Sequence, residues 1–445
     1  MATPPLTMDD HETDASSFSY VPSCFPDDIC FHIMLFLELN SIKHCVLISK
    51  QWNLMARKIP ISVDMSYKIE KLEHCLKLLS RSKLHWNMTS LDLTKNSLDT
   101  NSSVWIEIFM NSHYISSLKQ LNLNYNYDMG DPCFTMIAKS TKFQNLQVLK
   151  ASTCGITDFS VQVLAQNAAM SNLRELYLNR NDITESGVKA LSTSTIMSQL
   201  QVLDLYCKRI GPNGAQHLAL APFKLRELHL LACEIQDDGA IAIGKSPQMC
   251  NLTLLDLQAN SIETVGASAL LGSEYMKNLT SLNLSENKLG KSIGMIIASN
   301  LSNLTYLHLG DSKIGEEGAI SIVSSPNMSN LTFLSLCHNS LGADFASTLA
   351  SSVHISKLQK LDLYYNNLGD SGATSLASSA YLKSLTFLDL AYNTIGNEGV
   401  LSIALSRNLP SLKRLILANN NFTYTGEDAL KQSRYAAFTL MDELY

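Results

Sequence analysis

Leucine residues recur in a fixed frame from residue 88 almost to the end of the chain. The frame reads Leu-x-x-Leu-x-Leu-x-x-Asn-x-Ile or Leu, and one clean copy consists of Leu252, Leu255, Leu257, Asn260 and Ile262. The alternation in Leu-x-Leu places both leucines on one side of a short strand. Small and apolar residues at helical spacing follow the strand, so each copy predicts one strand and one helix.

Thirteen copies of the frame align with one another, at a mean spacing of 27 residues. Their first positions are Met88, Leu118, Leu146, Leu173, Leu200, Leu225, Leu252, Leu279, Leu304, Leu331, Leu358, Leu385 and Leu412. A period of this length indicates a solenoid, because one copy alone cannot bury its leucines and stacked copies form a continuous core.

These copies resemble the leucine-rich repeat of the ribonuclease-inhibitor type over about residues 88–430. The resemblance implies an α/β fold: a horseshoe solenoid with a parallel sheet on the concave side and helices on the convex side. Asn fills the ninth position in nine copies, where it can hydrogen-bond backbone groups of neighbouring turns.

Two irregularities interrupt the frame. Lys208 replaces the Asn of the fifth copy, which predicts an irregular turn. The copies that start at Leu200 and Leu279 span 25 residues, so we expect shorter convex segments there. Pro212 and Pro222 fall in the first of them, which favours a truncated helix.

A second pattern precedes the repeats. Phe25-Pro26-Asp27-Asp28-Ile29 is followed by Ile33, Leu37, Ile42, Val46, Ser49-Lys50 and Trp52. This stretch resembles an F-box without gaps, with Phe25 in place of Leu and Ser49 in place of Cys. The resemblance implies a small helical module that docks on the Skp adaptor of a cullin–RING ubiquitin ligase. The residues implied for that contact are Phe25, Pro26, Ile29, Ile33, Leu37 and Val46.

The same stretch has a simpler interpretation as a helical cap for the solenoid, because the first leucines of any repeat array need a cover. Residues 67–87 also predict a cap, since Ile69, Leu72, Leu76 and Leu79 form one helical stripe. We therefore expect four parts: a flexible acidic tail (1–20), an F-box-like helical module (21–66), a helical cap (67–87) and a leucine-rich-repeat domain (88–445).

Composition excludes several classes of protein. Apolar residues make up 46% and charged residues 17% of the chain, which indicates a globular protein. The net charge of −6 provides no general attraction to nucleic acid or to anionic membranes, and no apolar run has membrane-spanning length. The first 20 residues lack the apolar stretch of a signal peptide, so we expect a cytoplasmic or nuclear protein whose ten scattered cysteines are reduced.

Catalytic and metal-binding motifs are not found in the sequence. It contains no His-Glu-x-x-His, Gly-x-Ser-x-Gly or Gly-x-Gly-x-x-Gly. Cys154 and Cys233 occupy the Asn position and are expected to be buried thiols. His229 and His308 have no second His or Cys at metal-ligand spacing. We therefore expect no cofactor and no enzymatic activity.

The concave face remains as a surface for a partner. Frame positions three, five, seven and eight point outward, and they carry five basic and nine acidic residues over the thirteen copies. Exposed aromatic residues in the C-terminal copies predict a protein-binding site, because aromatic side chains dominate interface energetics. The predicted site consists of Tyr306, His308, Phe333, Asp362, Tyr364, Tyr365, Phe387 and Tyr392. For Phe333 and Phe387 the alternative is packing at the strand entrance.

Three functions fit these features. The first is a substrate-recognition adaptor of an SCF-type ubiquitin ligase, which binds Skp and the cullin core through the F-box-like module and a protein substrate through the repeats. The second is a free-standing repeat scaffold or inhibitor, like ribonuclease inhibitor. The third is a GTPase regulator, since Ran GTPase-activating proteins have similar repeats; their usual long acidic tail does not match the end of this sequence.

Overall fold

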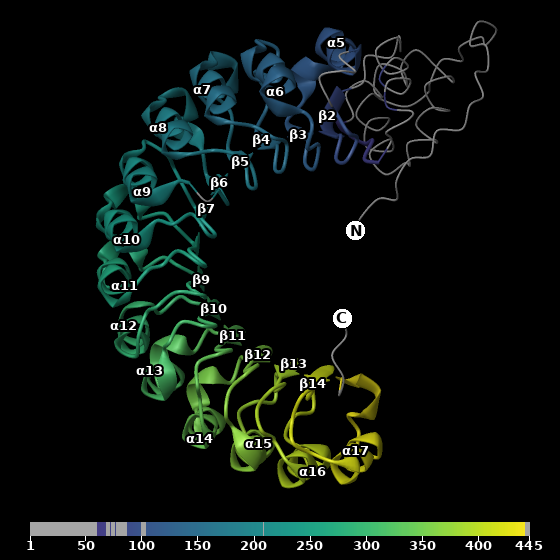
Figure 1. The fold of residues 1–445 in the computed structure, drawn as a ribbon, viewed down its shortest axis with the longest axis vertical. Coiled ribbons are helices and arrows are strands. Elements are labelled where there is room, and N and C mark those ends of the chain that lie inside the picture. Colours follow the sequence, from purple (N-terminus) through teal and green to yellow (C-terminus); the bar gives the residue numbers. More distant parts are fainter. Residues whose placement is uncertain are drawn as a thin grey trace, which may run out of the picture. The chain divides into compact units, whose positions relative to one another are not determined.

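A computed structural model describes residues 60–67, 72, 76, 87–98, 104–207 and 209–440. The chain divides into two compact units. The first contains residues 1–182 and 194–200, and the second contains residues 183–193 and 201–445. Each described unit is a solenoid of leucine-rich repeats, in which strands and helices alternate along the chain (Figure 1).

The strands of each unit are parallel and lie in chain order. In the described part of the first unit they are β1 (Pro60–Asp64), β2 (Asn87–Asp92), β3 (Gln120–Asn122), β4 (Val148–Lys150) and β5 (Glu175–Tyr177). Those of the second unit, as far as it is described, are β6 (Val202–Asp204), β7 (Glu227–His229), β8 (Leu254–Asp256), β9 (Ser281–Asn283), β10 (Tyr306–His308), β11 (Phe333–Ser335), β12 (Lys360–Asp362), β13 (Phe387–Asp389), β14 (Arg414–Ile416) and β15 (Thr439–Leu440).

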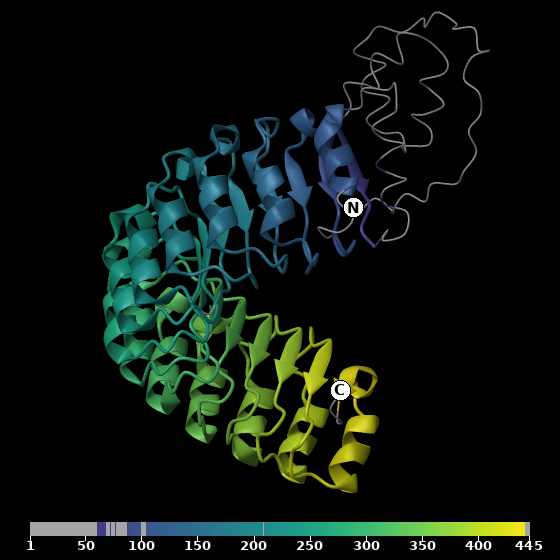
Figure 2. The same ribbon diagram turned by 45° about the horizontal axis from the view of Figure 1, so that its top comes forward.

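One α-helix follows nearly every strand. The described helices of the first unit are α5 (Val104–Asn111), α6 (Gly130–Lys139) and α7 (Asp158–Gln166). The second unit has α8 (Glu185–Thr193), α9 (Gly211–Leu220), α10 (Gln236–Lys245), α11 (Thr264–Leu271), α12 (Ser292–Asn300), α13 (Gly315–Val323), α14 (Ala343–Ser351), α15 (Gly369–Ser378), α16 (Asn397–Leu405) and α17 (Tyr424–Lys431). Within the second unit the strands line the concave side and the helices the convex side (Figures 1 and 2).

Short 3-10 helices connect several α-helices to the next strand. They are η2 (His113–Ser117), η3 (Ala168–Met170), η4 (Ile196–Gln199), η5 (Pro247–Met249), η6 (Glu274–Met276), η7 (Pro326–Met328), η8 (Val353–Ile355) and, before β15, η9 (Ala436–Phe438).

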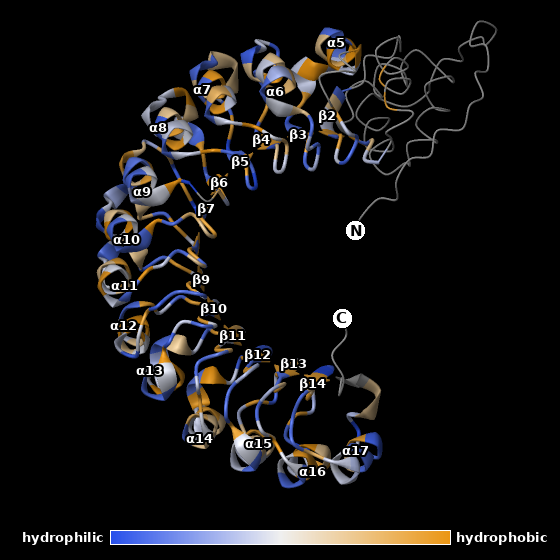
Figure 3. Ribbon diagram, viewed as in Figure 1, coloured by the Kyte–Doolittle hydropathy of each residue, from blue (hydrophilic) through white to orange (hydrophobic). Residues whose placement is uncertain are grey.

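The core of each repeat lies between its strand and its helix. Leu252, Leu255, Leu257 and Ile262 of one copy have no exposed surface, and the corresponding residues of the other copies are similarly buried. Hydrophobic and hydrophilic segments are mixed along the strands and helices of the second unit (Figure 3). The predicted leucine-rich-repeat fold is therefore confirmed.

The parallel sheet begins before the first copy that the sequence identified. β1 pairs with β2 in parallel, so Pro60–Asp64 form a strand where we expected the end of a helical module. Val63 and Met65 are buried in the positions of the frame leucines. The sequence pattern missed this copy because Pro60, Val63 and Met65 replace all three leucines. Leu72 and Leu76, from the predicted cap, are helical and buried.

Asparagine side chains join consecutive repeats. The amide oxygen of Asn366 accepts hydrogen bonds from the backbone N–H groups of Asn339 and Leu341, at 3.1 and 3.0 Å. Its amide nitrogen donates to the carbonyl oxygens of Leu336 and Leu363. Strands β3 to β14 are only three residues long, so these side chains satisfy backbone groups that a longer ladder would otherwise pair.

Cysteine partly replaces asparagine in this position. The thiol of Cys233 donates to the carbonyl oxygen of Leu205 at 2.8 Å, and that of Cys154 to the carbonyl oxygen of Leu123 at 3.0 Å. Both residues are buried, as predicted. Lys208, the predicted irregularity, lies outside the described residues.

A second ladder joins the helices. Asp370, in the first turn of α15, accepts hydrogen bonds from the N–H groups of Gly396 and Gly399 at 2.6 and 2.8 Å and so caps α16. Glu316 caps α14 in the same way through Gly342. Carboxylates at helix N-termini are stabilising because they pair unsatisfied N–H groups and oppose the helix dipole. A Cβ atom on Gly399 would lie 2.6 Å from Asp370 Oδ1, which explains the recurrent glycine.

The 25-residue copies do not have truncated helices. α9 spans ten residues and α12 nine, as long as the other helices of the unit. Within the described chain, these copies lack the 3-10 helix that η5 or η7 provides elsewhere. Pro212 lies in the first turn of α9, where the missing N–H has no helical partner to lose. The helix must pack against both neighbouring helices, so shortening falls on the connection that follows it.

We expect Asn366→Ala to lower the free energy of unfolding of the repeat domain by about 2–4 kcal/mol, because it leaves several buried backbone groups unpaired. Asn366→Cys should cost less, since Cys233 shows that a thiol can donate in this position. Chemical denaturation monitored by circular dichroism measures both. Equal stability of the alanine variant and the wild type would contradict the bridging role.

Candidate protein-binding surface

The concave side of β10 and β11 carries one group of stacked rings. Tyr306 and Phe333 occupy neighbouring strands in register, and their ring centroids are 4.2 Å apart with an interplanar angle of 8°. The ring of His308 lies 6.2 Å from that of Phe333. All three side chains are half-buried. Parallel strands bring the side chains of successive copies to stacking distance, so this group follows directly from the register.

A second group follows the strands β11, β12 and β13. His338, Tyr365 and Tyr392 all occupy position eight of their copies, and we call this column, with the adjacent Tyr364, the aromatic ladder. His338 stacks on Tyr365 at 4.3 Å, and Tyr365 lies 5.7 Å from Tyr392. Tyr364 contacts Tyr392 edge to face at 5.3 Å.

The backbone at position eight has a left-handed conformation. The φ angles of His338, Tyr365 and Tyr392 are 52°, 52° and 55°. Position eight has the same conformation in other copies, for example at Ala259 and Glu286, so it belongs to the repeat and not to the aromatic residues. Because the backbone conformation is the same at each of these positions, just after the strand, the side chains of successive copies are aligned with one another.

Phe387 stands apart from both groups. The guanidinium carbon of Arg414 lies 5.8 Å from the centroid of its ring, and the ring is half-buried at the strand entrance. The structure thus brings together Tyr306, His308 and Phe333, and separately Tyr364, Tyr365 and Tyr392. His338 was not among the residues predicted from the sequence, although it occupies the same frame position as Tyr365 and Tyr392. The assignment of these residues to substrate binding remains a prediction.

Carboxylates lie beside the rings. Asp362 accepts hydrogen bonds from the hydroxyl of Ser335 at 2.7 Å and from the N–H of Tyr364 at 3.0 Å. Asp389 accepts one from the N–H of Ala391 at 3.0 Å. Burial, together with the charge of Asp362, raises the pKa of Asp389 to about 6, although Arg414 opposes the shift. Burial likewise raises the pKa of Asp256, and it lowers that of His308 despite the nearby carboxylates.

Three thiols of the repeats, those of Cys154, Cys233 and Cys337, do not have the character of nucleophiles. Burial raises the pKa of Cys154 to about 12 and also raises that of Cys233. Burial raises the pKa of Cys337, beside the aromatic ladder, to about 11. A reactive cysteine needs a lowered pKa, so these thiols are structural. No group of three or more potential metal ligands occurs among the residues that the structure describes.

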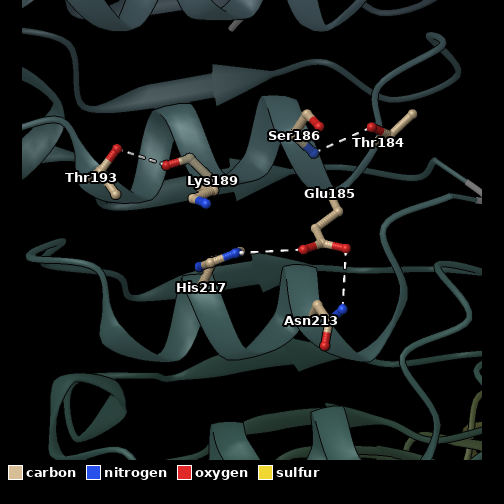
Figure 4. A network of polar contacts seen from close by, with 7 residues as sticks. All are labelled: Thr184, Glu185, Ser186, Lys189, Thr193, Asn213 and His217. Atoms are coloured by element: carbon tan, nitrogen blue, oxygen red, sulfur yellow. Dashed lines mark hydrogen bonds and ion pairs between the residues drawn. The ribbon is translucent and has the colours of Figure 1, made fainter.

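One polar network lies on the convex side, between α8 and α9 (Figure 4). Glu185 lies 3.7 Å from His217 Nε2 and accepts a hydrogen bond from Asn213 at 3.2 Å. The pair of Glu and His is the kind of contact that orients a general base, but both side chains are substantially exposed. Its evident effect is to join the neighbouring helices α8 and α9.

The six residues implied for Skp contact, Phe25, Pro26, Ile29, Ile33, Leu37 and Val46, lie outside the described residues. In the described part of the chain, no helix has both the length and the hydrophobicity of a membrane span.

Comparison with known proteins supports the repeats. The leucine-rich-repeat model matches seven segments, at residues 169–192, 221–244, 248–271, 275–298, 300–323, 354–377 and 381–404. No curated protein matches the sequence.

Solved structures with a similar chain path include a leucine-rich-repeat protein of Leptospira interrogans, with 19% identity, a TM-score of 0.48, and coverage of 86% of this chain and 95% of that one. The Rad7–Elc1 complex of yeast has 15% identity and a TM-score of 0.44, with coverage of 88% of this chain and 81% of that one. An internalin of Listeria monocytogenes has 17% identity and a TM-score of 0.40, with coverage of 93% of this chain and 97% of that one.

The raised pKa of Asp389 predicts a pH-dependent stability. A carboxyl group whose pKa is higher in the folded state contributes stability that is fully present below its ordinary pKa of 3.8 and is lost as the pH rises through about 6. The loss is on the order of 2 kcal/mol after allowance for partial exposure. Asp389→Asn should therefore be more stable than the wild type at pH 7 and equal to it at pH 4.

Denaturation midpoints at both pH values test this expectation. Asp428→Asn, on the exposed surface of α17, is a matched control that should change neither midpoint. An identical pH dependence in the wild type and Asp389→Asn would show that burial of this carboxylate does not affect the stability of the protein.

Proposed function

We propose that this chain of leucine-rich repeats is a non-enzymatic substrate-recognition adaptor of an SCF-type cullin–RING ubiquitin ligase. Residues 25–52 would bind the Skp adaptor and so connect the chain to the cullin core. The concave face of the repeats would bind a protein substrate. The chemistry of ubiquitin transfer would belong to other subunits.

The observation that carries the proposal is the gapless F-box-like pattern from Phe25 to Trp52, directly before a repeat domain. The pattern ends eight residues before Pro60, where the first repeat strand begins. Little chain therefore separates the segment that would bind the ligase from the solenoid that would bind the substrate. A short connection suits an adaptor, because the substrate must be held at a defined place relative to the ligase.

The concave face has the composition of a protein-binding surface. Half-buried aromatic side chains on a rigid sheet lose little conformational entropy when they are covered, and they provide large contact areas. Tyr365 retains 52% of its surface, although it stacks on His338.

The rival interpretations share this surface and lack the ligase. A free-standing scaffold or inhibitor would bind its partner through the same concave face, with residues 25–52 acting only as a cap. A regulator of a Ran-like GTPase would bind a nucleotide-loaded GTPase. Recovery of Skp with the protein separates the first proposal from both.

Skp capture tests the adaptor role. The wild-type chain should retain purified Skp in a pull-down, and affinity purification from cells should recover Skp and a cullin. Pro26→Ala combined with Ile33→Ala should abolish capture, since each truncation of a packed apolar side chain costs about 2–5 kcal/mol. The repeat domain should stay folded, because repeats interact mainly with their neighbours. Failure of the wild type to capture Skp would refute the proposal.

The substrate surface is tested on the same protein. Tyr364→Ala combined with Tyr392→Ala should weaken binding of the recovered substrate by about thirtyfold or more, as expected for truncated aromatic anchors. Skp capture should not change. A thermal melt distinguishes loss of contact from loss of structure. Unchanged binding with an unchanged melt would place the substrate elsewhere on the solenoid.

A further inference from the structure

The outward positions of the second unit have a one-sided charge. Positions five, seven and eight of its nine complete copies, which lie along and just beyond the strands, contain neither Lys nor Arg. The same positions carry six carboxylates, which are Asp204, Asp256, Glu286, Asp311, Asp362 and Asp389. The two basic residues at outward positions, Lys360 and Arg414, both occupy position three at the strand entrance.

The carboxylates nearest to the aromatic ladder have no cationic partner within the described part of the chain. Asp362 accepts hydrogen bonds from the Ser335 hydroxyl and the Tyr364 N–H and interacts with the thiol of Cys337. Asp389 accepts a hydrogen bond from the Ala391 N–H, and neither carboxylate forms an ion pair with a residue that the structure describes. Arg414 influences Asp389 from a distance but contacts the ring of Phe387. Half-buried carboxylates without a counter-ion are unfavourable in the free protein, so a cation that reaches them is bound favourably.

The rings of the aromatic ladder favour the same kind of ligand. The face of a tyrosine ring attracts a lysine ammonium or an arginine guanidinium within about 6 Å of its centroid. Tyr364, Tyr365 and Tyr392 lie 5.3 to 6.1 Å from one another, and they follow the strands that carry Asp362 and Asp389. Aromatic faces and carboxylates therefore adjoin on one surface.

The first unit contains a contact of this kind, between a lysine ammonium group and two tyrosine rings. The ammonium group of Lys95, at position eight of its copy, lies 5.0 Å from the ring centroid of Tyr67 and 5.2 Å from that of Tyr125, which hold position eight of the adjacent copies. The column at position eight thus places a cation between aromatic rings of neighbouring repeats. In the second unit the corresponding column supplies His338, Tyr365 and Tyr392 and no cation.

We propose that the aromatic ladder of β11–β13 binds a lysine or arginine side chain from a basic segment of a partner protein, with Asp362 and Asp389 as its counter-charges. The inference rests on the proposed function, in that it names the chemistry of the substrate that the concave face recognises. An acidic partner is disfavoured by the six carboxylates. A purely apolar partner would leave Asp362 and Asp389 uncompensated.

Fluorescence anisotropy of the full chain with labelled homopeptides tests the inference at pH 7.5. The probes are decalysine and decaglutamate, and we expect only decalysine to bind. Tyr365→Leu should weaken decalysine binding by about five- to tenfold, whereas Tyr365→Phe keeps the aromatic face and should remain within about twofold of the wild type. Asp389→Asn, which preserves the acceptor for the Ala391 N–H, should also weaken binding by about fivefold.

Matched controls lie on the convex side. Tyr424 is 82% exposed at the start of α17, and Asp428 is exposed on the same helix, so Tyr424→Leu and Asp428→Asn remove the same groups away from the ladder. Both should bind decalysine like the wild type. Equal losses in the control and the concave variants would show only general attraction to the net charge of −6 and would overturn the proposal.

Two other results would also overturn it: tighter binding of decaglutamate, or an equal loss in Tyr365→Phe and Tyr365→Leu, which would indicate a hydrogen bond from the phenol hydroxyl. Thermal melts of every variant identify any that fails to fold, and Asp389→Asn and Tyr365→Phe keep the test decisive in that case. Skp capture by the same proteins is an independent measurement. If the wild-type chain captures Skp but does not bind decalysine, this inference alone is refuted. If it binds decalysine but does not capture Skp, the adaptor role alone is refuted.

Discussion

The hydrogen bonds between one repeat and the next are the interaction on which the whole solenoid depends. Strands of three residues have too few backbone pairs to hold a sheet together, and their turns leave N–H and C=O groups buried. Asn366 and its counterparts satisfy these groups on the strand side, and Asp370 and its counterparts satisfy those at the helix N-termini. Each repeat therefore completes the polar contacts of its neighbour, while the leucines supply the apolar contact between them.

The sequence predicted the repeated parts of this structure well, because the leucine frame records burial directly. It failed where burial is achieved with other residues. Val63 and Met65 fill the leucine positions of a copy that begins with proline, and so β1 was not recognised. It also misplaced the shortening of the 25-residue copies. The length of a copy alone cannot show whether its helix or the connection after the helix is shorter. Packing against the neighbouring helices preserves the length of the helix, so the connection is the shorter part.

The sequence identified which residues of the repeats face outward, but it showed only part of how their side chains are organised; that this surface binds a partner stays a prediction. Outward positions follow from the strand period, so Tyr306, Phe333, Tyr364 and Tyr365 could be identified as surface residues. Their division into two stacked groups depends on register and ring orientation, which the sequence does not specify. His338 was overlooked because a single histidine is unremarkable until the column at position eight is seen. That Asp389 forms no ion pair with any residue the structure describes could likewise be recognised only from the positions of its neighbours.

The left-handed turn at position eight has a consequence for how such a surface changes over time. Lys95, Ala259, Glu286, Asp311 and Tyr365 adopt nearly the same φ there, so the main chain tolerates basic, small, acidic and aromatic side chains alike. The side chains of this column can therefore be exchanged for one another, while the repeats keep the distance between them constant. A single substitution can therefore alter which partner is recognised without a compensating change in the core, and new specificities are accessible to this scaffold in small steps.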